Sequence, residues 1–327
     1  MPDIHETLFN LFMPHAQRKL AVARQQSLRM AHYCSAESGL NILRSGEVFL
    51  RNSTLMNDFS EVAYGRNLLT NTWNGAAGEQ LRIILNQVDA SIVAMVEERV
   101  NGALNELLHE TYLVSLSEHQ ATEDQFGRLS MWRAYAPKDG VALILNNTAF
   151  LTESNSLNAF TSPVLYAAHL EFEREFAAVV GTLSENVALL KQSHPQQIAA
   201  LMINALIFAI QSTKHPAFAE EKEWRVIYTP TILQRERLLT EEQLRRVPTK
   251  ILPIRGVPQR IYTIPFRNYP DEGFAGAEIP ELIDRVLIGP SMDAYAIAQA
   301  FVAELGEKGV PAPHQRVFIT DIPLRHQ

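Results

Sequence analysis

The sequence predicts an α+β fold with a mixed or antiparallel β core and helical insertions. Short apolar segments typical of β-strands recur along the chain, and longer stretches with apolar residues at helical spacing separate some of them. This order contains too many strands for a helical bundle and is too irregular for a doubly wound fold. The chain has 327 residues, 46% of them hydrophobic, which is enough to bury a sizeable core.

We predict two parts along the chain: an N-terminal helical extension, residues 1–29, and a single α+β domain with helical insertions, residues 30–327. No linker rich in Pro, Gly or Ser divides the second part. Residues 3–27 have apolar residues at helical spacing, and Pro14 is expected to kink this helix or to split it in two. The expected inward positions of this helix are Leu8, Phe12, Leu20 and Val22.

The elements of the second part follow from periodicity and from residues typical of turns and caps. Ser35 is suited to cap the helix after the first strand, and Gly46 is suited to end it. One long helix is predicted over residues 78–108, because its apolar residues follow helical spacing. Other helices are predicted near residues 60–72, 128–136, 170–191, 195–213 and 293–306, and strands near residues 30–35, 47–54, 111–118, 140–145, 162–168, 221–228, 261–266, 285–290 and 316–322.

The composition argues against several classes of protein. The one cysteine, Cys34, excludes an intramolecular disulfide and a multi-cysteine metal site, so we expect a reducing compartment, by default the cytoplasm. The N-terminus lacks the apolar core of a signal peptide, and the longest apolar run, residues 199–210, is too short to span a bilayer. A formal net charge of -7 argues against a broad surface for nucleic acids. We expect no membrane segment, and the oligomeric state stays open.

Two glutamates, Glu221 and Glu223, precede an apolar segment. In a strand over residues 221–228 they share one face with Arg225, whereas Trp224, Val226 and Tyr228 point to the core. Carboxylates two residues apart on a strand lie roughly 6–7 Å apart. One carboxylate of such a pair can stabilise a developing cation while the other accepts a proton. The alternative is a solvated face on which Arg225 balances one glutamate.

Two further strands carry hydroxyl groups on one face. Ser115 and Ser117 share a face, where they would hydrogen-bond a ribose, hold a glutamate in place, or simply pack under a helix. Tyr33 and Ser35 share a face at the end of the first strand. Tyr33 would either stack on or hydrogen-bond a ligand, or cap the core.

Other groups give weaker indications. The ten histidines contain no HExxH motif or close ligand series, so we predict no metal site. No P-loop or dinucleotide-binding glycine pattern is present, which disfavours a Rossmann dehydrogenase and a P-loop kinase. Trp132 and Tyr135 would line a pocket or pack in the core. The polar residues Asn52, Asn57, Asp58 and Glu61 are interpreted as turn and capping residues.

Several stretches together resemble the large bacterial family called domain of unknown function 2971. They are "HYCSAESGLNILRSGEVFLRNSTLMNDFSE", "VSLSE", "MWRAYAPKDGVALIL", "FAEEKEWRV", "VLIGP" and "FITDIPLR", in order from about residue 30 to the end. Phe59 stands where that family usually has proline, and Leu324 where an aromatic residue is more common. The resemblance implies no established activity.

The order of three motifs also resembles that of the ADP-ribosyltransferase fold. Tyr33 and Ser35 would occupy the first motif, Ser115 and Ser117 the second, and Glu221 and Glu223 the third. Tyr33 stands where a histidine or arginine is usual in that superfamily, although His32 and Arg51 are close in sequence. This likeness is an analogy of motif order.

The resemblance implies an NAD-dependent ADP-ribosyltransferase, with NAD as substrate and an unknown acceptor, as in a bacterial toxin or defence factor. Glu223 would stabilise the positive ribose, and Glu221 would orient or deprotonate the acceptor. The supporting residues would be Ser115 and Ser117 beside Glu223 or the ribose, Tyr33 at the nicotinamide ribose, and Arg51 or Arg225 at the pyrophosphate. Two alternatives stay open: a non-catalytic module of the same fold that binds a nucleotide, nucleic-acid end or protein, and a hydrolase that uses the glutamates with a metal or water.

Overall fold

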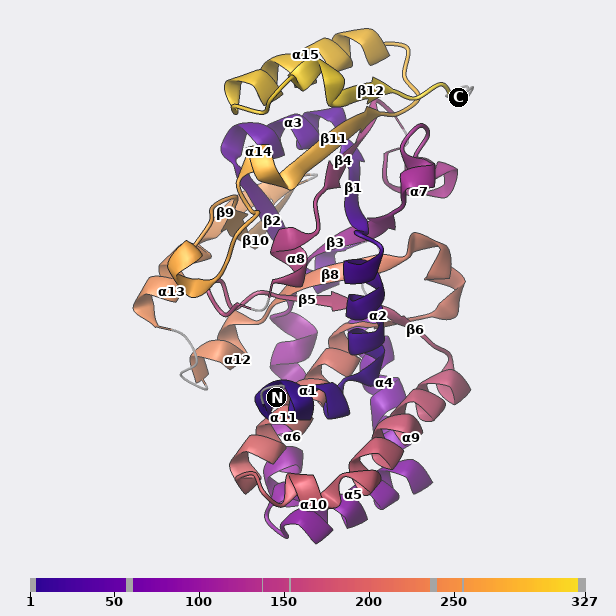
Figure 1. The fold of residues 1–327 in the computed structure, drawn as a ribbon, viewed down its shortest axis with the longest axis vertical. Coiled ribbons are helices and arrows are strands. Elements are labelled where there is room, and N and C mark those ends of the chain that lie inside the picture. Colours follow the sequence, from indigo (N-terminus) through magenta and orange to yellow (C-terminus); the bar gives the residue numbers. More distant parts are fainter. Residues whose placement is uncertain are drawn as a thin grey trace.

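A mostly antiparallel open sheet occupies one end of the molecule, and a group of helices occupies the other (Figure 1). The computed structural model describes residues 4–56, 61–136, 138–152, 154–235, 240–254 and 256–322. The strands are β1 (Arg29–Ser35), β2 (Glu47–Asn52), β3 (Tyr112–His119), β4 (Gly140–Leu145), β5 (Phe160–Pro163), β6 (Leu165–Tyr166), β7 (Thr213–Lys214), β8 (Glu223–Tyr228), β9 (Thr249–Ile254), β10 (Val257–Pro265), β11 (Ile283–Ile288) and β12 (Val317–Ile319).

The strand order is β12-β11-β4-β1-β3-β2-β10-β9, and β8 links β5 to β3. All pairings within this sheet are antiparallel except that of β11 with β12, and β6 and β7 form a separate parallel pair. This architecture confirms the predicted α+β class with a mixed or antiparallel core and helical insertions. The boundary between an extension and a single domain stays a prediction.

Helices cover one end of the sheet and build the other end of the molecule. In Figure 1, α3 and α15 lie beside β11 and β12, whereas α4, α5, α6, α9, α10 and α11 form the opposite end. The helices are α1 (Ile4–Phe12), α2 (Pro14–Gln25), α3 (Ala36–Ser45), α4 (Glu61–Trp73), α5 (Ala76–Val88), α6 (Ile92–His109), α7 (Leu129–Tyr135), α8 (Thr148–Leu151), α9 (His169–Glu185), α10 (Val187–Leu190), α11 (Pro195–Gln211), α12 (Pro230–Arg235), α13 (Glu241–Arg246), α14 (Ile279–Leu282) and α15 (Ala294–Glu307).

The sheet divides beside β3. One edge of β3 pairs with β8 along most of its length, and the other edge pairs first with β2 and then with β1. Between these two pairings His32 Nδ1 lies 3.2 Å from the carbonyl oxygen of Ser115. Directly opposed residues share a face, so the pair Ser117 and Glu223 and the pair Ser115 and Arg225 lie on one side of the sheet.

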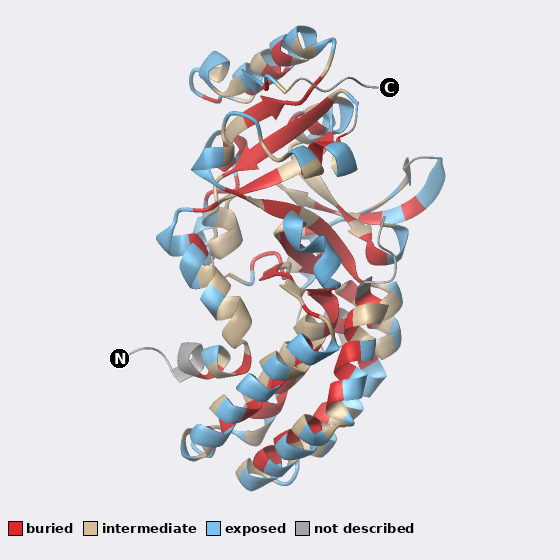
Figure 2. Ribbon diagram, turned by 90° about the vertical axis from the view of Figure 1, so that its right-hand side faces the viewer, coloured by how far each residue is buried: buried red, intermediate tan, exposed pale blue. Residues whose placement is uncertain are grey.

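The two faces of the sheet differ in polarity. One face packs a large apolar core that includes Trp224, Val226 and Tyr228, as their alternation predicts. The other face carries the polar residues of β3 and β8, with a small apolar core under α7 that includes Trp132. Figure 2 shows buried residues along the strands and on the facing sides of the helices at the other end, which have a core of their own.

Local signals account for most element ends. Pro14 is the first residue of α2, so the N-terminal helix is split there as predicted. Ser35 accepts a hydrogen bond from the Ser38 amide, and Gly46 is left-handed with φ of 63°, which confirms the predicted cap and terminator of α3. Val22, however, is 43% exposed and does not point inward.

Several predicted elements differ from the structure, among them the helix predicted over 170–191, which is divided between α9 and α10. The helix predicted over 78–108 is two helices, because Asp89 Oδ1 accepts hydrogen bonds from the amide and hydroxyl of Ser91 and ends the first. The strand predicted over 162–168 is divided between β5 and β6. The edge strand β9 was not predicted, and Asn57, Asp58, Phe59 and Leu324 lie outside the described residues.

Candidate functional site

The predicted glutamate pair lies where a 3-10 helix, η3 (Pro216–Glu221), leads into β8. The strand begins at Glu223, so Glu221 is the last residue of η3, and the predicted strand over 221–228 is two residues too long. Lys222 separates the glutamates with a left-handed φ of 47°. The prediction that both glutamates lie on one strand face is therefore wrong, because a tight reversal rather than strand alternation brings them together.

Glu223 is held by three side chains. Its Oε1 accepts hydrogen bonds from Ser115 Oγ at 2.6 Å and from Arg225 Nε at 2.9 Å. Its Oε2 accepts from Arg225 Nη2 at 3.2 Å and from Lys214 Nζ at 3.3 Å. Burial raises the pKa of Glu223, but Arg225, Lys214 and Ser115 outweigh it and lower that pKa to about 2. Glu223 is therefore a buried, fixed carboxylate, so this part of the predicted charged face is not solvated.

Lys214 joins the two carboxylates. Its ammonium lies 2.6 Å from Glu221 Oε2 and 3.3 Å from Glu223 Oε2, and the side chain is 3% exposed. Glu221 keeps 16% exposure of its side chain, compared with 6% for Glu223. Lys214 and Arg225 thus balance the buried Glu223 and the partly exposed Glu221, because charges withdrawn from water require partners. We call Lys214, Glu221, Glu223 and Arg225 the glutamate cluster.

Two tyrosines border the glutamate cluster. Tyr135 from α7 donates a hydrogen bond to Glu221 Oε1 at 2.6 Å, and Tyr166 Oη accepts one from the Glu223 amide at 2.8 Å. Burial and the adjacent carboxylate of Glu221 raise the pKa of Tyr135, so its hydroxyl stays protonated as a donor. Tyr135 therefore touches the candidate site, whereas Trp132 packs in the core beneath α7.

The predicted hydroxyl pair is part of the same site. Ser115 holds Glu223, and Ser117 Oγ donates to the carbonyl oxygen of Glu221. The structure thus brings the second and third predicted motifs into direct contact. Three roles were considered for the serines, and the structure shows the one in which a serine holds a glutamate.

Tyr33 reaches this region through Arg128. The Arg128 amide donates to Tyr33 Oη at 3.0 Å, and the Arg128 guanidinium contacts Ser117 Oγ and, at 3.2 Å, the carbonyl oxygen of Glu221. The ring of Tyr33 meets Trp132 edge-on with centroids 4.9 Å apart. Gly127 is needed here, because its φ is 64° and a Cβ would lie 2.9 Å from Tyr33 Oη.

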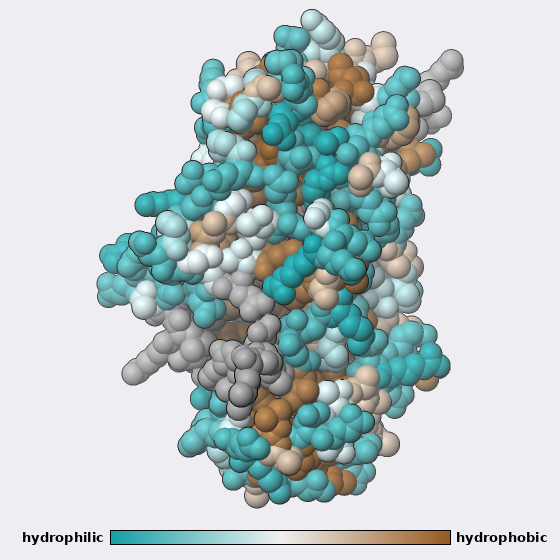
Figure 3. Space-filling view, viewed as in Figure 1, coloured by the Kyte–Doolittle hydropathy of each residue, from teal (hydrophilic) through white to brown (hydrophobic). Residues whose placement is uncertain are grey.

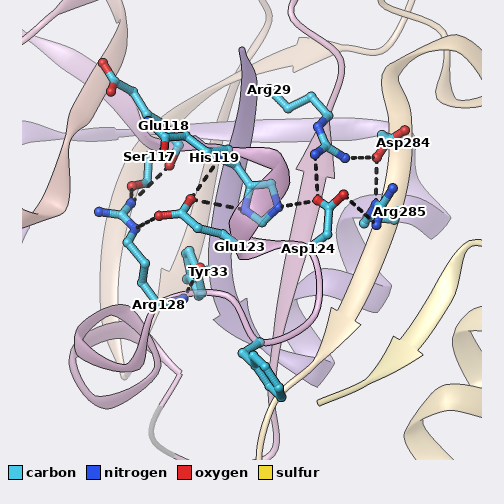
Figure 4. Close-up of polar contacts among 12 residues, drawn as sticks. Arg29, Tyr33, Ser117, Glu118, His119, Glu123, Asp124, Arg128, Asp284 and Arg285 are labelled. Carbon is cyan, nitrogen blue, oxygen red and sulfur yellow. Dashed lines mark hydrogen bonds and ion pairs between the residues drawn. The ribbon is translucent and has the colours of Figure 1, made fainter. Parts of the chain in front are cut away.

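A second polar network adjoins Arg128 on the same face (Figure 4). Arg128 pairs with Glu123 at 3.3 Å, and the buried His119 places Nε2 3.0 Å from Asp124 Oδ1. Arg29 then joins Asp124, at 2.6 Å, to Asp284, at 2.5 Å. This network ties β3, β1 and β11 together beside the glutamate cluster.

The remaining predicted ligand residues lie apart from the glutamates. Ser35 is exposed and its hydroxyl caps α3, as described above. Arg51 donates to the carbonyl oxygen of Leu55 at 2.8 Å and to Gln259 Oε1 at 3.3 Å. Arg225 is fully buried, and besides Glu223 it contacts the carbonyl oxygen of Gln211 at 2.6 Å. Arg51 and Arg225 therefore have protein partners where we predicted a pyrophosphate.

Lys214, Arg128 and Tyr166 were not predicted as site residues. Lys214 and Tyr166 lie on two-residue strands, and Arg128 lies before α7, so no periodicity marks them in the sequence. In the part of the chain that the structure describes, no group of three or more His, Cys, Asp or Glu side chains is arranged to hold a metal ion. No helix among those residues is long and apolar enough to cross a membrane.

The family model described as Protein of unknown function (DUF2971) matches residues 131–226. This match confirms the resemblance drawn from the sequence, and it contains "MWRAYAPKDGVALIL" and "FAEEKEWRV", hence Tyr135 and the whole glutamate cluster. The other stretches quoted for the resemblance lie outside the matched residues. No curated protein and no solved structure matches the chain.

Proposed function

We propose that this protein is an NAD-dependent ADP-ribosyltransferase whose reaction centre is the glutamate cluster. One observation carries the proposal: three stretches far apart in sequence meet on one face of one sheet. Tyr33 contacts Arg128, Arg128 contacts Ser117, and Ser115 holds Glu223. A set of fixed hydrogen-bonding groups around a carboxylate is the arrangement that electrostatic stabilisation of a cation requires.

The two carboxylates take different roles in this proposal. The bond between the nicotinamide nitrogen and ribose C1′ breaks, its electron pair leaves with nicotinamide, and the ribose becomes positively charged. Glu221 keeps more exposure, so we assign it to face this cation and to take the proton when the acceptor oxygen or nitrogen bonds to C1′. Glu223 positions Lys214, which contacts Glu221 directly. Glu221 thus keeps the acceptor role expected from the sequence and also takes the role at the ribose that was expected of Glu223.

The pyrophosphate needs a different arginine from those first considered. Arg225 is fully buried and Arg51 lies apart from the glutamate cluster, whereas Arg128 contacts Tyr33 and Ser117 and keeps 11% of its side chain exposed. A guanidinium binds phosphate oxygens through two parallel N–H groups. We therefore assign the pyrophosphate to Arg128 and the nicotinamide ribose to Tyr33.

A second candidate is a non-catalytic binding module of the same fold. The burial of Glu223 and its neutralisation by Lys214 and Arg225 favour it, because such a carboxylate is as well suited to hold the sheet together as to face a substrate. In that case Glu221, Tyr135 and Arg128 would bind a nucleotide or a macromolecule without turnover.

The test is nicotinamide release from NAD, with and without a bacterial lysate as acceptor. We expect Glu221→Gln to lose about 100-fold or more of the rate, since it removes the charge that faces the ribose. Glu220→Gln is the matched control, because Glu220 is adjacent and exposed. Equal rates for Glu221→Gln and wild type would refute the assignment of Glu221. If folded wild-type protein releases no nicotinamide, stabilisation by NAD or by a macromolecule would identify the binding module.

A further inference from the structure

A cavity of about 900 Å³ lies between the N-terminal helices, the segment that leads into β5, and helices α9 and α11. We call it the apolar cavity. Its volume falls in the range of sites for small organic molecules, about 300–1,000 Å³. Figure 3 shows hydrophobic residues reaching the surface on this face of the molecule, both beside the sheet and among the helices. Apolar side chains that line the cavity include Phe12, Leu20, Phe160, Phe176, Met202 and Leu206.

Three residues that line this cavity carry a buried polar atom without a hydrogen-bond partner among the described residues: the partly buried His15, at Nε2, and the buried Asn158 and Ser212. Asn158 is 6% exposed and Ser212 is 5% exposed. Asn158 Nδ2 and Ser212 Oγ have no hydrogen-bond partner among the residues that the structure describes. Most buried polar side-chain atoms in native proteins are hydrogen-bonded, so an unpartnered pair in one cavity points to a ligand that supplies the missing bonds.

The two groups lie near opposite ends of β5, although Ser212 belongs to the end of α11. Asn158 precedes the strand, and the Ser212 carbonyl oxygen accepts from the Leu165 amide at 2.7 Å just after it. The four residues of β5 span roughly 13 Å at the usual strand rise. A molecule that reaches both groups must therefore be elongated.

The polar groups of the cavity suit an uncharged ligand. Asn158 and Ser212 are an amide and a hydroxyl, and both donate without carrying charge. The charged side chains Glu175 and Arg24 on the cavity wall already have protein partners: Glu175 pairs with Arg18 at 2.8 Å, and Arg24 donates to the carbonyl oxygen of Leu151 at 3.1 Å. An anion buried in this mostly apolar cavity would therefore lack a partner of opposite charge, which is unfavourable. We propose that the apolar cavity binds an elongated, uncharged, mostly apolar molecule with a hydroxyl or carbonyl group at each end, which accepts hydrogen bonds from Asn158 and Ser212.

Binding is tested with decane-1,10-diol, measured by displacement of the neutral fluorescent probe N-phenyl-1-naphthylamine from the full chain. The dianion decanedioate has the same carbon chain and serves as the charged comparison. We expect saturable displacement by the diol and much weaker displacement by decanedioate. Absence of saturable displacement by the diol, or equal displacement by both compounds, would overturn the proposal.

Two variants locate the site. Ser212→Ala removes one hydrogen bond and should weaken diol binding about three- to tenfold, while the unliganded protein keeps or gains stability because an unsatisfied hydroxyl is lost. Ala205→Trp fills the cavity from α11 and should abolish binding, whereas Ala300→Trp, on the exposed side of α15, should not change it. Unchanged diol affinity in Ser212→Ala would remove that residue from the site and refute the proposal. None of these measurements involves NAD, so the result is independent of the proposed transferase activity.

Discussion

The glutamate cluster and the apolar cavity lie next to each other, but they differ in how far their polar groups are paired. In the cluster, the buried Glu223, Lys214 and Arg225 lie beside the partly exposed Glu221, and each carboxylate has more than one partner. In the cavity, the walls are mostly apolar, and three buried polar atoms of lining residues have no partner among the described residues. Charged groups that have partners stabilise one arrangement of the chain. A buried polar group without a partner can instead gain free energy by forming a hydrogen bond with a ligand.

The two regions share the small sheet of β6 and β7. Its register pairs Leu165 with Thr213 and Tyr166 with Lys214, so each pair lies on one face. Leu165 and Thr213 line the apolar cavity, while Lys214 belongs to the glutamate cluster and Tyr166 contacts it. The two regions therefore lie on opposite faces of the sheet of β6 and β7. A variant in one region should for this reason also be tested for its effect on the other.

The largest effect is expected from Arg225→Ala. The change leaves Glu223 buried without its closest cation, and breaking one side of a buried ion pair costs about 3–5 kcal/mol. We expect the free energy of unfolding in urea to fall by that amount. Arg133→Ala is the matched control, because Arg133 is exposed on α7 and its loss should change the free energy by less than about 0.5 kcal/mol.

A similar small effect for both arginine variants would contradict the view of the glutamate cluster as a buried ionic unit. Binding of decane-1,10-diol gives the second readout for Arg225→Ala. If the cavity is independent of the cluster, the folded variant should retain diol affinity.

Acid should destabilise the protein by protonating Glu223 in the glutamate cluster. The folded-state pKa of Glu223 is about 2, below its ordinary value of 4.5, because of Arg225, Lys214 and Ser115. A depressed carboxyl pKa contributes stability that is fully present above pH 4.5 and is lost as the pH falls toward 2. The contribution is on the order of 3 kcal/mol.

The measurement compares the free energy of unfolding of wild type and Glu223→Gln at several values from pH 6 to pH 2.5. The variant lacks this titrating carboxyl, so its curve should be flatter and should approach that of wild type at the acid end. Parallel curves would show that Glu223 titrates alike in the folded and unfolded states.

Strand alternation accounts for what the sequence predicted well. It placed Trp224, Val226 and Tyr228 in the core, and it put Ser115 and Ser117 on the face that meets Glu223. The same reasoning failed for Glu221, because the left-handed Lys222 interrupts the strand and lysine carries no signal for that conformation.

Contacts between distant segments account for what the sequence did not predict. Lys214 reaches the glutamates from β7, and Arg128 reaches Tyr33 and Ser117 from the start of α7. The apolar cavity is likewise formed by helices and loops that are far apart in the chain, so its volume and its unpartnered atoms exist only after folding. Hydrophobic periodicity describes one helix or strand at a time, so it cannot predict contacts between distant segments.

The smallest effect is expected from Ser35→Ala. This change tests whether Ser35 caps helix α3 or binds a ligand. Ser35 was predicted as part of the first motif, yet its hydroxyl accepts from the Ser38 amide and lies at the N-terminus of α3. Loss of this cap should lower the free energy of unfolding by about 1 kcal/mol and leave both nicotinamide release and diol binding at wild-type values. A loss of nicotinamide release without a loss of stability would return Ser35 to the site and extend that site beyond the glutamate cluster to the far end of β1.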